Sequence, residues 1–206
     1  MSQSPAPPRR RRGNARGEQT RSVLLAAAVR SFADRGFHGT STRDIALAAE
    51  MSPAVMYAHY ATKEELLFEL SIDGHRSVQA LLETEVRRHT TTTDRLRAAA
   101  ACFGQWHAEF HLQARVVQYE LDALSEEHLA EVTVLRRAIQ GRFGELIRNG
   151  VDEGSFQVAD VEMTAMSLTS LGIDVARWYR STGKWTPEQI GRHHGRLALR
   201  AVGVAG

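Results

Sequence analysis

The sequence predicts an all-α protein of about nine helices. Apolar residues recur every three or four positions from Thr20 onward, and no segment alternates polar and apolar residues over a useful length. Side chains that cap helix N-termini also recur, several of them followed three residues later by an acidic or amide partner. With 206 residues the chain can bury a substantial core in one or two domains.

Four helices are expected in the N-terminal third, over residues 20–35, 42–49, 53–60 and 63–88. The last three are each preceded by a hydroxyl side chain that can act as the N-cap: Ser41, Ser52 and Thr62. Asp44 and Glu65 complete capping boxes with the first and last of these caps. Pro53 occupies the first helical position, where a missing N–H has no effect.

Five further helices are expected, over residues 94–111, 113–123, 126 to about 154, 161 to about 180, and 187 to the end. Ser125 and Asp160 cap the helices that begin at 126 and 161. Gly183 ends the helix that begins at 161, and Thr186 forms a capping box with Gln189. We therefore expect a disordered basic tail over 1–17, a domain of short helices over 18–64 and a larger helical domain over 65–206.

The composition excludes several classes of protein. No run of about 18 apolar residues is present, and the N-terminus lacks the apolar stretch of a secretory signal, so no membrane span is expected. Cys102 is the single cysteine, which excludes an internal disulfide and favours a reducing, cytoplasmic setting. Arginine supplies all basic residues except Lys63 and Lys184, a bias that indicates a GC-rich bacterial genome.

Positive charge is concentrated at the N-terminal end. Residues 1–64 hold ten basic and five acidic residues, a net charge of +5, whereas the remainder holds 16 basic and 19 acidic residues, a net charge of −3. A local positive surface favours phosphate binding, because the release of counterions drives the association. The run from Arg9 to Arg12 is a candidate arm for the DNA minor groove. The alternative is a solvated tail without a partner.

The helices at 42–49 and 53–60 are separated by a short turn and form a predicted helix-turn-helix. The second helix of such a unit fits the major groove, which is about 12 Å wide. The residues expected to face the DNA are Ser52, Pro53, Ala54, Val55, Tyr57 and His59. Alanine and valine allow close approach to base edges, Tyr57 and His59 offer polar tips, and the helix N-terminus favours phosphate. Met56 and Tyr60 are expected on the inner face.

At these residues the chain resembles TetR-type transcriptional repressors. The stretch "TSTRDIALAAEMSPAVMYAHYATKEELL" is similar to their DNA-binding signature, and the resemblance covers residues 20–70. It implies that Thr42 and Arg43 contact the DNA backbone or groove edge and that Lys63 binds a phosphate. One departure is Glu50, where the family usually has glycine. If this position needs a positive φ, a non-glycine residue costs about 1 kcal/mol. The alternative for the whole stretch is a tight helical corner without a ligand.

The resemblance also implies a second domain in which helices of residues 94–206 surround a ligand and the last two helices pair with a second subunit. The candidate ligand-binding residues are the aromatic residues Trp106, Phe110, Tyr119 and Trp178. The segment from Asp174 to Gly203 is similar to TetR-type regulators of lipid and steroid catabolism, several of which respond to acyl-CoA thioesters. Ordinary core packing is the alternative for each aromatic. Arg115 and Arg177 are candidates for an anionic ligand or for surface salt bridges.

No catalytic site, metal site or cofactor is predicted. His107 and His111 have the i, i+4 spacing of two metal ligands, but zinc peptidases place Glu directly after the first histidine, where this chain has Ala108. No glycine-rich phosphate loop, nucleophile elbow or carboxylate pair of useful spacing is present, so an enzyme is not expected.

These observations together predict a homodimeric one-component repressor. It would bind a palindromic double-stranded DNA operator and be released by a small hydrophobic or amphipathic ligand, with an acyl-CoA as one candidate. The fourth helix belongs to both domains and would act as the lever between them. Two alternatives remain: an activator or architectural protein with the same DNA-binding head, and an enzyme fused to a helix-turn-helix.

Overall fold

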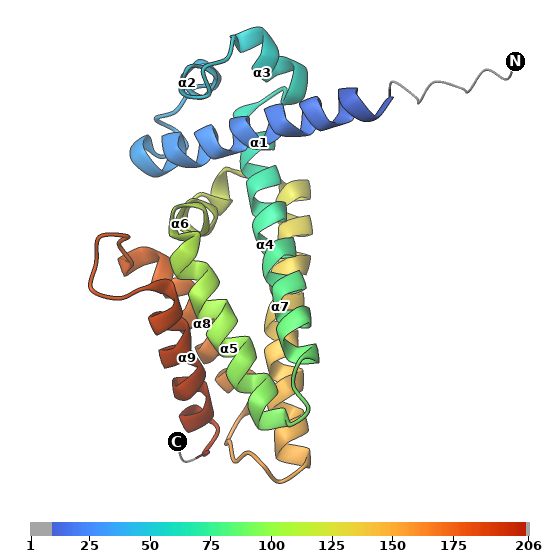
Figure 1. Cartoon of the computed structure of the whole chain (residues 1–206), viewed down its shortest axis with the longest axis vertical. Coiled ribbons are helices and arrows are strands. Elements are labelled where there is room, and N and C mark those ends of the chain that lie inside the picture. The colour runs from blue at the N-terminus through green and yellow to red at the C-terminus, as the bar shows by residue number, and fades with distance from the viewer. Residues whose placement is uncertain (1–9, 205–206) are drawn as a thin grey trace, which may run out of the picture. The chain divides into compact units, whose positions relative to one another are not determined.

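The computed structural model describes residues 10–204, and the side chains of residues 15–204. Within this range it contains nine α-helices and no β-strand, as the sequence predicts (Figure 1). The helices are α1 (Arg10–Arg35), α2 (Thr42–Ala48), α3 (Pro53–His59), α4 (Lys63–Arg87), α5 (Thr92–Glu109), α6 (His111–Tyr119), α7 (Glu126–Asp152), α8 (Val161–Trp178) and α9 (Pro187–Ala201), with a 3₁₀ turn at Leu121–Ala123. No helix in this range is both long and apolar enough to span a bilayer.

The chain divides into two compact units, with the boundary between Leu67 and Phe68 inside α4. In the N-terminal unit, α1, α2 and α3 pack around apolar side chains that are fully buried or nearly so: Leu24, Ala28, Phe32, Ile45, Ala46, Met56 and Tyr60. All of these residues lie on the helix faces that the apolar spacing assigns to the core. The inner faces of the predicted helix-turn-helix are therefore confirmed.

The first helix is longer than the sequence suggests. It begins at Arg10 instead of near Thr20, so residues 10–17 are helical and not disordered as expected. Arg and Ala are strong helix formers, and over this stretch their preference outweighs the cost of Gly13 and Gly17. Residues 1–9 of the expected tail, Arg9 included, lie outside the described residues.

The helix caps agree closely with the sequence. The capping boxes of Ser41 with Asp44 and of Thr186 with Gln189 are both complete, and the other expected caps are also present: Ser52, Thr62, Ser125 and Asp160. At the fourth helix, however, the carboxylate of Glu65 accepts from the amide of Ala61, at 2.7 Å, and not from that of the cap itself.

The end of α8 differs from the expectation. The helix stops at Trp178 instead of near Arg180, and Gly183 forms a separate turn in which its amide donates to the carbonyl of Arg180. Tyr179 adopts an extended conformation and is buried in a cluster with Val175 and residues of α5 and α9. Burial of this ring therefore ends the helix before glycine is reached.

Helix α5 is the central element of the C-terminal unit. It contacts α7 and α8, and most extensively α9, which runs alongside it in Figure 1. Two glycines of α9 allow this close approach. A Cβ atom at Gly191 would lie 2.7 Å from the carbonyl oxygen of Ala101, and one at Gly195 would lie 2.8 Å from that of Arg97. At these two positions the backbone of α9 therefore lies close against the backbone of α5.

Candidate DNA-binding helix and ligand cavity

The turn between α2 and α3 requires a left-handed residue, and Glu50 provides it. Glu50 has φ of 56° and is the one non-glycine residue of the described chain with positive φ. Its amide donates to the carbonyl of Leu47, and the amide of Met51 donates to that of Ala46, at 3.0 and 2.9 Å. This pair of bonds is a Schellman motif, which commonly has glycine at the left-handed position. The turn thus keeps its geometry without glycine, at the cost of backbone strain.

Helix α3 has one buried and one exposed face. Met56 and Tyr60 anchor it in the core, while the expected DNA-facing residues Pro53, Ala54, Val55 and Tyr57 are exposed. Ser52 is also exposed and its hydroxyl caps the helix, whereas His59 is half-buried. The structure thus brings most of the predicted DNA-binding residues onto one outward surface.

Helix α2 contributes to the same surface. The hydroxyl oxygens of Thr42 and Tyr57 lie 2.8 Å apart, so a hydrogen bond joins the start of α2 to the outer face of α3. Arg43 follows on α2 and is exposed. These positions remain compatible with the predicted contacts to the DNA backbone.

Lys63 has a structural role that the sequence does not reveal. Its ammonium donates to the carbonyls of Phe37 and Thr40, at 2.7 and 3.0 Å, and lies 4.3 Å from the centre of the Phe37 ring. Two of its three N–H groups are therefore used to fix the segment between α1 and α2. The predicted phosphate contact can use only the third.

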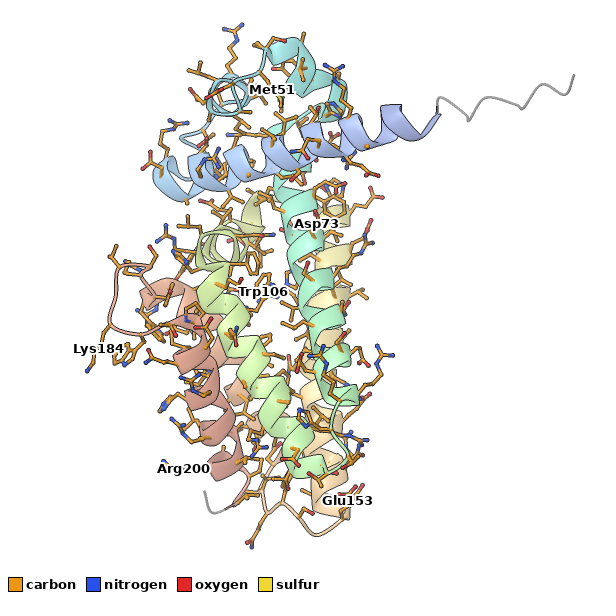
Figure 2. The ribbon with its side chains drawn as sticks, in the orientation of Figure 1. Met51, Asp73, Trp106, Glu153, Lys184 and Arg200 are labelled. Carbon is orange, nitrogen blue, oxygen red and sulfur yellow. The ribbon has the colours of Figure 1, made fainter. Side chains whose placement is uncertain are left out.

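The C-terminal unit contains a partly open cavity of about 110 Å³. Helices α4 to α8 all contribute to its walls, and the lining residues are Gly74, His75, Val78, Phe103, Trp106, His107, Gln113, Ala114, Val117, Gln118, Arg136, Ile139, Gln140, Thr169 and Ile173. Trp106, labelled in Figure 2, extends from α5 towards α4, where a Cβ atom at Gly74 would lie 3.5 Å from its indole.

Of the four aromatic residues predicted to bind a ligand, the cavity is lined by Trp106 alone. Phe110 is partly exposed and packs against the Trp106 ring, at 5.2 Å between centroids. Tyr119 is exposed and lines a neighbouring pocket. Trp178 is also exposed and stacks edge-on with Trp185. The structure therefore does not bring the four aromatics together.

Two histidines line the cavity in neutral form. The Nδ1 atoms of His75 and His107 lie 2.6 and 2.9 Å from the carbonyl oxygens of Ser71 and Phe103. Burial lowers the pKa of both imidazoles, and that of His107 to about 4. Since a carbonyl only accepts, each Nδ1 must carry the hydrogen, which leaves Nε2 as an acceptor.

The i, i+4 pair of His107 and His111 does not gather further ligands. His111 Nδ1 bonds the carbonyl of Ala108, and its ring packs against Tyr179. Among the described residues, no group of three or more histidine, cysteine or acidic side chains is arranged for a metal ion.

Sequence reasoning missed Arg136, Gln118 and His75, which come from three different helices. Arg136 had a usable signal. It lies four residues after Val132 and three before Ile139, and both of these are buried, so a charged side chain occupies a core-facing position of α7.

A second feature of this unit is an exposed apolar surface on α8 and on the segment between α8 and α9, which α9 borders. The large apolar residues exposed there are Met163, Met166, Leu171, Trp178 and Trp185. Part of this surface forms a groove of about 780 Å³, in which apolar residues alternate with Asp174, Arg192 and Arg196.

Comparison with known proteins extends the resemblance over most of the chain. A family profile described as "Bacterial regulatory proteins, tetR family" matches residues 24–70, and one described as "Tetracyclin repressor-like, C-terminal domain" matches residues 89–202. The HTH-type transcriptional repressor KstR2 of Mycobacterium tuberculosis is 26% identical over 191 residues, which cover 88% of this chain and 92% of KstR2. The HTH-type transcriptional activator FasR of Mycolicibacterium smegmatis is 31% identical over 176 residues, which cover 81% and 77%.

Solved structures give the same result. A bacterial regulatory protein of the tetR family from Rhodococcus RHA1 superposes with a TM-score of 0.85 and 40% sequence identity, covering 91% of this chain and 98% of that one. The helix-turn-helix, the all-helical second unit and both profile matches lead to one conclusion. The chain belongs to the TetR family of transcriptional regulators.

Proposed function

We propose that the protein is a homodimeric repressor that binds a palindromic DNA operator and is released by a small apolar or amphipathic effector. The observation that carries the DNA-binding part is the two-faced character of α3. Its inner residues fix the helix in the core, and its outer residues, from Pro53 to Tyr57, are small or carry a polar tip. A short helix of this kind fits the major groove. Such a role places the protein with the DNA in the bacterial cytoplasm.

The exposed surface of α8 and α9 supports the dimer. Contiguous apolar surface on a soluble protein commonly marks an interface, and here it combines aromatic, aliphatic and charged side chains as interfaces do. A two-fold pair would present two copies of α3. To read successive major grooves of a palindrome, the two copies must lie about 34–36 Å apart.

The cavity between α4 and α8 supports the effector part. Its walls combine apolar side chains with about as many polar ones, and the polar groups can fix the orientation of a ligand. Helix α4 lines this cavity and continues through the boundary into the N-terminal unit. An effector that binds the DNA-incompetent state more tightly would act through this helix. To change the protein from almost fully DNA-bound to almost fully released, the effector must prefer the DNA-incompetent state by about 5.5 kcal/mol.

The similar proteins suggest more than one chemical class of effector. The resemblance to regulators of lipid and steroid catabolism makes an acyl-CoA thioester one candidate. KstR2, one of the similar proteins, is described in its solved structure as a ketosteroid transcriptional regulator; that structure has a TM-score of 0.81 and 26% identity to this chain.

A second candidate function is activation of transcription, favoured by the similarity to the activator FasR. A reporter fused to the promoter beside the gene distinguishes repression from activation. Under repression, deletion of the gene raises expression, and a chromosomal copy restores the low level. Under activation, the same deletion lowers expression. Footprinting of that promoter with the purified protein should show a protected palindrome, and an unprotected promoter would contradict both functions.

A further inference from the structure

Arg136 forms part of the cavity wall on α7, and no carboxylate of residues 15–204 pairs with its charge. Its side chain is half-buried, and its Nη1 and Nη2 atoms both donate to one oxygen, Oε1 of Gln118, at 3.1 Å each. Of the residues that the structure describes, no acidic side chain forms an ion pair with it. A partly buried guanidinium held only by a neutral amide retains an unbalanced positive charge.

No other side chain of the cavity wall balances this charge. The remaining lining residues include no aspartate, glutamate or lysine. The two histidines are neutral near pH 7, because burial lowers the pKa of each. Burial also lowers the pKa of Arg136, which reflects the same cost of removing a cation from water. The ligand cavity thus has apolar and neutral polar side chains in its wall, with Arg136 as its single cationic group.

Arg136 also borders a second, more polar pocket of about 260 Å³, and the two spaces share Gln118, Arg136 and Ile173. The neighbouring Arg177, a sequence candidate for an anionic ligand, is already neutralised there. It donates to both carboxylate oxygens of Asp174, at 2.6 and 2.9 Å. Arg136 therefore lies where the apolar cavity meets the polar pocket, and its charge is available to a ligand.

We propose that the effector is a small organic acid whose carboxylate binds Arg136 while its apolar part fills the cavity beside Phe103 and Trp106. This inference rests on the proposed ligand-responsive function and narrows its ligand class. A carboxylate would form a bidentate pair with the guanidinium and replace the amide oxygen of Gln118. The acid group must be attached directly to the apolar part, because Arg136 lines the same cavity.

Two features favour a free acid over a CoA thioester. In a thioester the phosphates are separated from the acyl group by a long neutral arm, so the acyl end would meet Arg136 without a charge. The cavity is also small. At about 110 Å³ it accepts a compact apolar group, and the carboxylate of an acid can point to the polar pocket that Arg136 also borders.

The test compares acids with their uncharged amides on the full-length protein. Calorimetry measures the binding of benzoate, cyclohexanecarboxylate and hexanoate, each against the amide of the same carbon skeleton. We expect at least one acid to bind about ten-fold or more tightly than its amide, since hydrogen bonds between charged groups are the stronger ones. The Arg136→Met variant should lose this preference. Arg137→Met, which alters an exposed arginine next to it on α7, should keep it.

Several outcomes would overturn the proposal. These are equal binding of acid and amide, no binding by any of the acids, or an acid preference that survives in Arg136→Met. The comparison of acid and amide on the unaltered protein does not depend on the folding of a variant. Operator binding without any ligand is measured in parallel by fluorescence anisotropy. If the operator is bound but only a CoA thioester releases it, the organic-acid effector is wrong, whereas the proposed ligand-responsive regulator is correct. If no operator is bound, the proposed function itself fails.

Discussion

The phenolic oxygen of Tyr57 lies 2.8 Å from Oγ1 of Thr42, so a hydrogen bond joins α3 to the first turn of α2. The sequence assigns both residues to DNA binding, Tyr57 for its polar tip and Thr42 through the resemblance to TetR-type repressors. In the structure they form one unit on an exposed surface. The bond orients a ring that is 52% exposed and would otherwise be free to rotate.

We expect Tyr57→Ala to weaken operator binding about ten-fold, because it removes both the ring and its hydroxyl from the recognition surface. Tyr57→Phe keeps the ring but loses the hydroxyl and its bond to Thr42, so its affinity should be intermediate. Fluorescence anisotropy with labelled operator measures both. The melting temperature should stay the same, since Tyr57 is not part of the core. Unchanged affinity in Tyr57→Ala would show that α3 is not the recognition helix.

The left-handed conformation of Glu50 predicts a stabilising substitution. Glu50→Gly relieves the left-handed penalty, which is partly offset by the greater backbone entropy of glycine in the unfolded chain. Compared with Glu50→Ala, which removes the same carboxylate but keeps Cβ, Glu50→Gly should raise the free energy of unfolding of the N-terminal unit by about 1 kcal/mol. Urea denaturation followed by circular dichroism gives the difference. Equal stability of the two variants would mean that the turn relaxes without strain.

A charge placed in the exposed surface of α8 should separate the proposed dimer. Leu171 lines its groove and is 48% exposed, so Leu171→Glu would bury a carboxylate in the interface without a partner. Light scattering at micromolar concentration should then report the mass of one chain instead of two. Val134→Glu is the matched control on α7, where the side chain is 64% exposed. A dimer that persists in Leu171→Glu would place the interface elsewhere.

The buried His107 makes stability depend on pH. Its pKa is lowered to about 4, first by burial, with smaller contributions from His75, His194 and Arg136, while the bond to the Phe103 carbonyl opposes the shift. In the unfolded chain the imidazole takes up a proton near pH 6.5. Between these values the unfolded state binds more protons, so the free energy of unfolding falls as the pH drops from about 6.5 to 4.

The loss attributable to His107 amounts to as much as about 3 kcal/mol. In His107→Gln the stability should therefore change less steeply over this range, although His75, whose pKa is lowered in the same direction, still contributes. Denaturant titrations at several pH values measure the slope. The same substitution at the exposed His38 is the control. An identical slope in His107→Gln would show that folding does not lower the pKa of this imidazole.

Much of the fold follows from local sequence. The caps at Ser41, Ser52, Ser125 and Asp160 depend on contacts within three residues, and the apolar spacing of α3 assigns Met56 to the core, so these features could be predicted. The sequence does not show whether Glu50 adopts a positive φ, because this angle is set by the Schellman hydrogen bonds of the folded turn.

Features that depend on tertiary packing could not be predicted in the same way. The early end of α8 reflects the burial of Tyr179, and nothing in the residues around Gly183 indicates it. The cavity is formed by five helices, so the partnership of Arg136 with Gln118, 18 residues apart, appears only when α6 and α7 are packed together. Residue type alone does not indicate which aromatic side chains face the cavity, and Phe110, Tyr119 and Trp178 do not line it.

The glycine contacts between α5 and α9 have a mechanical consequence. Flexible side chains between two helices absorb small displacements by changing rotamer, whereas Gly191 and Gly195 have no side chain that could do so. A shift of α5 caused by a molecule against Phe103 or Trp106 should therefore move α9 almost as one body with it. Because α9 also carries part of the surface assigned to subunit pairing, occupancy of the cavity and the dissociation constant of the dimer should be thermodynamically linked. Sedimentation with and without a bound acid would reveal the link, and identical constants would show that α5 moves alone.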